Sequence, residues 1–225
     1  MIRKTPLLHA TSGGVLSPAD RVTEIFGGLL MVLAVTLVAG IDSGGPASVQ
    51  ALLRAALGGN FAWGIIDGVL YLMAQRFGRA RQARLVAAVR DARDDGAIRA
   101  ALREAIAPEL VAPMTEAEAA RIFSMVHALA ARLAPVPRGL TRRDLVGAFG
   151  CFCLCVGCAL PAIVPFVLFD SPVIALRVSN GVSLASLFAL GTVWADQIDA
   201  SRLLTGFGLL LLGAALVGLQ IALGG

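Results

Sequence analysis

The stretch GGNFAWGIIDGVLYLMAQRFGRARQARL, residues 58–85, decides the fold class. Its first part is predominantly apolar, and its last ten residues include four arginines. A bilayer core about 30 Å thick requires roughly 20 residues of helix. The pattern therefore predicts a membrane helix over 57–77 that continues as a basic helix. Asp67 lies near the middle of this span, where a carboxylate costs about 2.5–3.5 kcal/mol on insertion scales.

The composition of the whole chain also indicates a membrane protein. Of its 225 residues, 57% are hydrophobic and 15% are charged, whereas soluble domains average about 25% charged residues. Of the 19 lysines and arginines, 13 lie between Arg76 and Arg143. The sequence has no nucleic-acid-binding motif and none of the common catalytic motifs. We therefore expect membrane segments around one polar insertion, with neither an enzymatic nor a nucleic-acid-binding role.

Five stretches are long and apolar enough to span a bilayer. The predicted spans are 24–41, 57–77, 145–169, 172–195 and 203–223. Basic residues favour the cytoplasmic side, which places segment 1–23 inside the cell, and the 42–56 loop and the C-terminus outside. The excess of arginine over lysine is typical of a GC-rich bacterial genome. We predict an all-α integral membrane protein with five transmembrane helices, located in a bacterial cytoplasmic membrane.

Residues 78–143 form the polar insertion between the second and third spans. The pattern predicts three helices: the basic continuation of span two, a short helix from Gly96 to Pro108, and a third helix opened by a Thr115/Glu118 capping box. A cytoplasmic domain of this size is marginally stable alone. We expect it to lean on a partner copy or on the membrane segments, which comprise 24–77 and 144–225.

Asp67 is the first candidate functional residue. Asn60, Gly64 and Tyr71 share its helical face, and Gly64 and Gly68 are spaced to let a second membrane helix approach closely. Protein or a water-filled path should therefore surround the carboxylate. Two interpretations remain open: transport chemistry, or a structural carboxylate paired with a charge such as Arg177.

Three further residues allow a functional and a structural interpretation. Glu24 and Met31, two turns apart in span one, can form an entry path for a divalent cation, or they can be a helix N-terminal acid and a packing methionine. Asn180 shares a face with Ser183 and Ser186. That face can hydrogen-bond to a neighbouring helix or line a path opposite Asp67.

Cysteines and glutamates form two more groups. Cys151, Cys155 and Cys158 share a helical face and Cys153 points elsewhere, a pattern that favours packing over a closed zinc site. The insertion carries acidic residues that can be a solvated face or can bind divalent cations, as in carboxylate-rich bundles. These are Glu104, Glu109, Glu116 and Glu118.

The order of elements and two stretches of sequence resemble the vacuolar iron transporter family. GCALPAIVPFVLF (157–169) is similar to that family's third span, and RVSNGVSLASLFALGTVWADQIDASRLLTGFGLLLLGAALVGLQIALGG (177–225) is similar to its fourth and fifth spans. The resemblance covers most of the chain and is strongest after residue 145.

The resemblance implies a homodimer that exchanges Fe(II), and often Mn(II), for protons. The family uses an aspartate followed by glycine in span one, a methionine in span two and glutamates in the insertion. Here Gly27 stands where the first-span carboxylate is expected, and the Asp-Gly pair is Asp67-Gly68 in span two. Met73 matches the second-span methionine, and the four insertion glutamates are the counterparts of the family's glutamates.

Two functional hypotheses follow. The first is divalent metal/proton exchange across the membrane, in which Asp67 binds a proton and then Fe(II) or Mn(II), with no permanently bound cofactor. The second is a non-transporting membrane scaffold or metal sensor that acts through its cytoplasmic helices.

Overall fold

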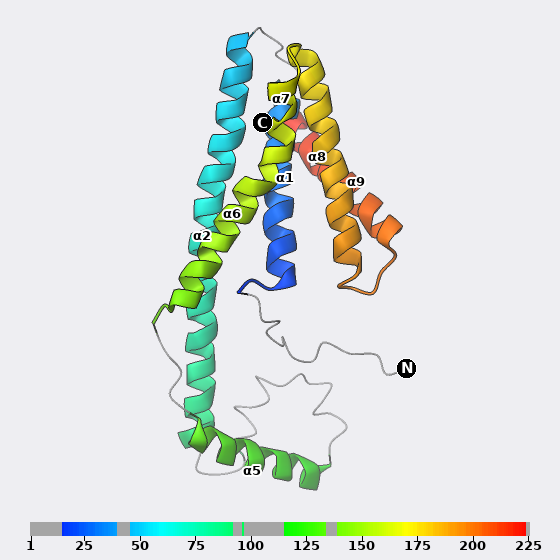
Figure 1. The fold of residues 1–225 in the computed structure, drawn as a ribbon. Helices are drawn as coiled ribbons and strands as arrows, with labels where there is room; N and C mark the ends of the chain where they lie inside the picture. Colours follow the sequence, from blue (N-terminus) through cyan, green and yellow to red (C-terminus); the bar gives the residue numbers. More distant parts are fainter. Residues whose placement is uncertain (1–14, 40–45, 92–95, 97–114, 134–138, 224–225) are drawn as a thin grey trace. The chain divides into compact units, whose positions relative to one another are not determined.

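The computed structural model describes residues 15–39, 46–91, 96, 115–133 and 139–223. Most of those residues are helical, and none of them lies in a strand. The helices are α1 (Pro18–Ala39), α2 (Pro46–Asp91), α5 (Glu116–Arg132), α6 (Arg142–Ile163), α7 (Pro165–Leu168), α8 (Pro172–Ala195) and α9 (Arg202–Ala222) (Figure 1). The all-α prediction is confirmed for this part of the chain.

Within the described residues, four helices are long and apolar enough to cross a membrane: α2, α6 with α7, α8 and α9. They correspond to the second to fifth predicted spans. α1 is apolar after Glu24, but its first turns also carry Asp20 and Arg21. Several long apolar helices suggest a protein embedded in a membrane, whereas the first predicted span, 24–41, and the orientation of the termini stay predictions.

The predicted 42–56 loop is wrong from Pro46 onward, because α2 already begins there. Proline at the first helical position and the following alanines and leucines favour helix. In the structure Leu52 and Ala56 are also buried on one face of it. The predicted helix from Gly96 to Pro108 falls outside the described residues, apart from Gly96 itself.

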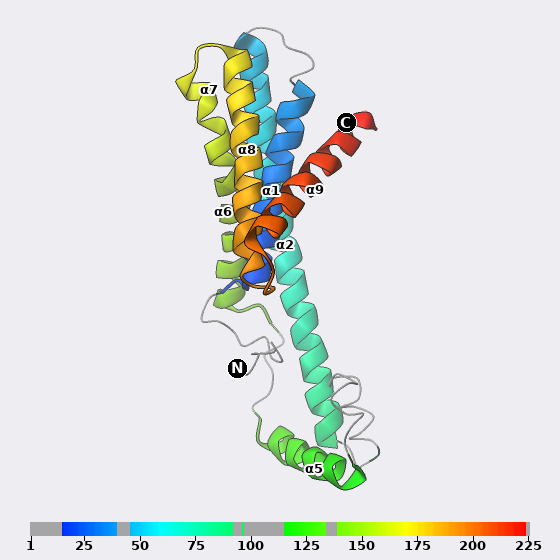
Figure 2. The same ribbon diagram turned by 90° about the vertical axis from the view of Figure 1, so that its right-hand side faces the viewer.

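The chain divides into two compact units: Met1–Tyr71 with Arg142–Gly225, and Leu72–Thr141. In the first unit, α1 packs against α6, α8 and α9, and the views show it between the first half of α2 and the pair α8 and α9 (Figures 1 and 2). Leu29, Leu33 and Ala34 of α1 join leucines of α8 and α9 in the main hydrophobic core. The outer helices expose large apolar side chains, as lipid-facing surfaces do.

Two helix starts are capped by side chains, and the one at Thr115 confirms the predicted capping box. The Ser17 backbone N–H donates to the Asp20 carboxylate (3.0 Å), and the Asp20 N–H donates to the Ser17 hydroxyl (3.1 Å), so the two residues cap α1 reciprocally. Thr115 and Glu118 form the same kind of capping box at the start of α5. Each pair satisfies N–H groups that a helix N-terminus otherwise leaves without partners.

The two prolines of the third predicted span interrupt it. Pro161 lies within α6, and Pro165 begins the short α7. A proline has no backbone N–H, so it leaves a carbonyl without its helical donor. Close to this break, the buried Ser179 hydroxyl of α8 donates to the Ala162 carbonyl (2.6 Å). The kinked span is thereby tied to α8.

Reciprocal capping holds the second unit together. The Arg90 guanidinium, in the last turn of α2, donates to the Ala130 and Leu133 carbonyls at the end of α5 (3.0 and 2.9 Å). Nδ1 of His127 in α5 lies 2.9 Å from the Val89 carbonyl of α2 and donates to it. Each helix thus satisfies C-terminal carbonyls of the other.

The second unit should loosen when Arg90 is replaced. Arg90→Met keeps most of the apolar stem but removes the hydrogen bonds, which contribute about 1 kcal/mol in a partly exposed setting. We expect hydrogen exchange of the α5 amides to speed up about fivefold in the full-length protein. Arg84→Met, an exposed arginine of the same helix, is the control and should leave exchange unchanged. Equal effects of the two substitutions would refute the capping role.

α8 and α9 should separate if a methyl group is added at their closest approach. A Cβ on Gly191 would lie 2.7 Å from the Gly206 Cα and from the Thr205 carbonyl oxygen, so two backbones would have to part. We expect Gly191→Ala to cost about 1–3 kcal/mol and to lower the melting temperature of the detergent-purified protein. Gly208→Ala, where a Cβ meets nothing within 4 Å, should be neutral or slightly stabilising.

Candidate functional site

Three side chains from three helices of the first unit meet at the candidate site. The Glu24 carboxyl group of α1 lies next to the Asp67 carboxyl group of α2 and the Cys151 thiol of α6. Oε2 of Glu24 is buried without a hydrogen-bond partner, and Cys151 is fully buried. The site therefore contains two carboxyl groups in contact and an acceptor atom that no protein group satisfies.

Glycines of α1 and α2 let both helices pack closely against α6. A Cβ on Gly28, one turn after Glu24, would collide with the Cys158 thiol and lie 2.7 Å from the Cys155 carbonyl oxygen. On α2, a Cβ on Gly64 would lie 3.2 Å from the Phe152 Cα, and one on Gly68 would lie 3.1 Å from the Ala148 carbonyl oxygen. The close helix approach predicted from the Gly64/Gly68 spacing is thus observed, and α6 is the partner helix.

α1 and α2 run antiparallel, which fixes the residues that face each other. Glu24 is next to Asp67, Gly27 is near the Trp63 indole and Gly28 is near the Asn60 amide. Residues later in the sequence of α1 therefore face residues earlier in the sequence of α2.

Asn60 and Met31 lie further along the same helix pair. Asn60 is fully buried, and its Nδ2 donates to the Ala56 carbonyl of its own helix (3.0 Å). The Cys155 thiol lies 3.5 Å from the Asn60 carbonyl oxygen and 3.7 Å from its Oδ1. The Met31 sulfur packs over Gly59, 3.5 Å from where a Cβ would lie. Both residues are therefore placed two turns from the carboxyl pair, on the two helices that carry it.

The remaining predicted pathway residues lie elsewhere. Oδ1 of Asn180 accepts a hydrogen bond from the buried Thr36 hydroxyl (2.6 Å), which joins α8 to α1. Met73 is half exposed and belongs to the second unit. Arg177 is exposed on α8, and the interactions described for Asp67 involve Glu24 and Cys151 rather than this arginine.

The insertion glutamates contribute less to the described structure. Glu104 and Glu109 lie outside the described residues, and Glu116 and Glu118 are exposed in the first turn of α5. The Thr115 hydroxyl and backbone N–H donate to the Glu118 carboxylate (2.7 and 2.8 Å) and hold its pKa below the usual value. Over the described ranges, no three His, Cys, Asp or Glu side chains converge closely enough to hold a metal ion.

The four cysteines are free thiols. Cys151 and Cys155 are buried and Cys158 is partly buried, while Cys153 is exposed, which agrees with the predicted shared face. The proximity of Cys151 to Glu24 was not predicted. It depends on how α1 packs against α6, which no local sequence signal gives.

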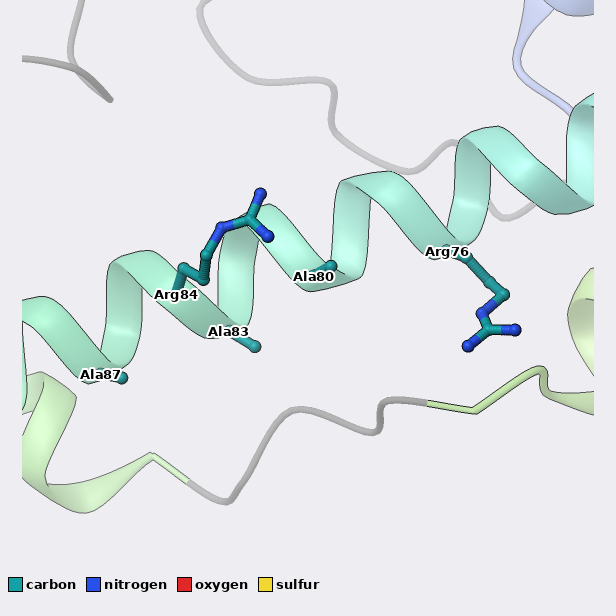
Figure 3. A pocket seen from close by; sticks show the side chains of 5 residues that line it. All are labelled: Arg76, Ala80, Ala83, Arg84 and Ala87. Atoms are coloured by element: carbon teal, nitrogen blue, oxygen red, sulfur yellow. The ribbon is translucent and has the colours of Figure 1, made fainter.

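The described lining of a pocket in the second unit does not bring together side chains that could bind a common ligand. Its described lining comes from one helix, α2: Arg76, Ala80, Ala83, Arg84 and Ala87. The two guanidinium groups are two turns apart and point in different directions (Figure 3). They therefore do not converge on a common ligand, and the α1–α2–α6 cluster remains the candidate site.

Comparison with known proteins adds no assignment to this geometry. No protein-family model matches the chain, and no curated protein is significantly similar to it.

Proposed function

We propose that the protein exchanges a divalent metal ion, Fe(II) or Mn(II), for protons across a bacterial cytoplasmic membrane, with its N-terminus in the cytoplasm. Glu24 and Asp67 would take up the proton and the cation in turn. The observation that carries the proposal is the contact between these two carboxyl groups, from neighbouring apolar helices.

Electrostatics explain why a proton and a divalent cation can replace each other at such a pair. Each ionised carboxylate inside a membrane costs about 2.5–3.5 kcal/mol on insertion scales, and two like charges in contact raise the cost of ionising both. One proton shared by the pair removes most of that cost, and a bound divalent cation removes it equally well. In this proposal the pair alternates between a proton-bound state and a cation-bound state.

The groups around the pair suit a borderline divalent cation. Carboxylate oxygens bind Mn(II) and Fe(II), and sulfur ligands shift the preference away from Mg(II) and Ca(II). Oε2 of Glu24 is an acceptor without a partner, the Cys151 thiol is adjacent, and Met31 lies two turns deeper on α1. Binding the cation would require these groups to move closer together than in the proton-bound state.

The resemblance to vacuolar iron transporters supports the same function. That family places a carboxylate in its first span, where this chain has Gly27. Glu24 lies one turn before Gly27 on α1 and is in contact with Asp67. We propose that this pair replaces the family's first-span aspartate. The insertion glutamates would then raise the metal concentration near the cytoplasmic entrance.

The test is Fe(II) and Mn(II) flux into proteoliposomes under an imposed pH gradient. We expect Asp67→Asn and Glu24→Gln each to reduce proton-coupled flux by at least roughly tenfold. The double variant should be no worse than either single one, because residues that act as a unit lose their function together. Asp170→Asn, an exposed carboxylate just after α7, is the matched control and should retain flux.

Other outcomes would refute the proposal in distinguishable ways. Flux that survives both substitutions would keep transport but remove the carboxyl pair from it. If protein shown to be folded moves neither metal, the exchange hypothesis is wrong, and the scaffold or sensor hypothesis becomes the better account.

A further inference from the structure

α5 has two apolar faces, and among the described residues of the second unit only one of them is buried. Phe123 and Ala130 are buried, 3% and 4% exposed, as is Val89 of α2. On another face, Met125 is 71% and Leu129 is 58% exposed. α5 belongs to the part of the chain that we expect outside the bilayer, so lipid does not account for this exposed face.

The exposed face carries an acidic residue at one end and a basic residue at the other, at equal distances from Met125. Glu118, Met125 and Arg132 are spaced by seven residues, so they lie along one line of the helix. All three side chains are exposed. The acid is seven residues before Met125 and the base is seven residues after it. An antiparallel copy of the same helix, centred on Met125, would therefore present the opposite charge at each end.

We propose that two copies of this chain dock through α5, antiparallel, around a twofold axis at Met125. Met125 would then pack against its counterpart, and Glu118 of each copy would face Arg132 of the other. The small Ala128 side chain would lie opposite Ile122 of the partner and allow the helices to approach. A twofold contact uses the same patch on both copies, which is the requirement that this charge order meets.

The charge pattern favours a second copy over a membrane surface. An anionic bilayer attracts arginines but repels carboxylates, and α5 carries Glu116 and Glu118 in its first turn. The contact buries one helix face per copy and is weak by itself. Two copies confined to the same membrane meet at a high effective concentration, so a weak contact is sufficient.

Disulfide formation in the full-length protein tests this arrangement. In proteoliposomes under mild oxidation, we expect Met125→Cys to form a linked dimer at least roughly fivefold faster than Ser124→Cys. Ser124 is also exposed, but it points about 100° away around the helix. The unsubstituted protein gives the background from the native cysteines. Equal rates at positions 124 and 125 would overturn the proposal.

The charge pairing has its own test in the Met125→Cys protein. Arg132→Glu should slow crosslinking roughly fivefold, since it replaces two attractive pairs with repulsive ones. Combining it with Glu118→Arg should restore the rate. Glu118→Gln retains an acceptor for the Thr115 cap and should slow crosslinking to a smaller extent. Crosslinking rates that stay the same in all three charge variants would show that the copies do not dock in this register.

Discussion

The close approach of α1, α2 and α6 is the constraint on which the rest of the structure depends. Apolar helices in lipid gain little from the hydrophobic effect when they associate, so they rely on close backbone packing. Gly28 lets α1 contact α6 at the Cys155 carbonyl, and Gly64 and Gly68 bring α2 onto the same helix. Any larger side chain at Gly28 would separate the helices. The same contact sets the position of Glu24.

The candidate site follows from that packing. Glu24 and Asp67 are far apart in sequence, and their contact exists because α1 and α2 run antiparallel in one register. Glu24 and Asp67 are both partly buried between helices, and shielding from lipid lowers the cost of a carboxyl group at membrane depth. The pair is also incomplete, since Oε2 of Glu24 has no partner. A site with an unused acceptor and two acids suits reversible binding of a proton or a cation better than a permanent structural role.

Much of the helical architecture could be predicted from the sequence, because long apolar runs and capping residues are local signals. The span 172–195 coincides with α8, and the Ser17/Asp20 and Thr115/Glu118 starts are observed. The helical segment Pro46–Ala56 was missed although it carries local helix signals, because the expected boundary followed the apolar run and not the helix propensity. The proximity of Glu24 to Asp67 and Cys151 could not be predicted, because it depends on how three helices pack rather than on a local signal. Arg90 was read as one charge of a basic helix, since its role as a cap depends on where α5 packs.

The central claim is that the Glu24–Asp67 pair gives up a proton when it binds a metal ion. Infrared difference spectroscopy of the purified protein, with and without Mn(II), measures this directly through the carbonyl band of a protonated carboxyl group. The account predicts that Mn(II) removes such a band, and that Asp67→Asn and Glu24→Gln each abolish the change. A spectrum in which Mn(II) leaves every protonated carboxyl band in place, in protein shown to be folded, would contradict it.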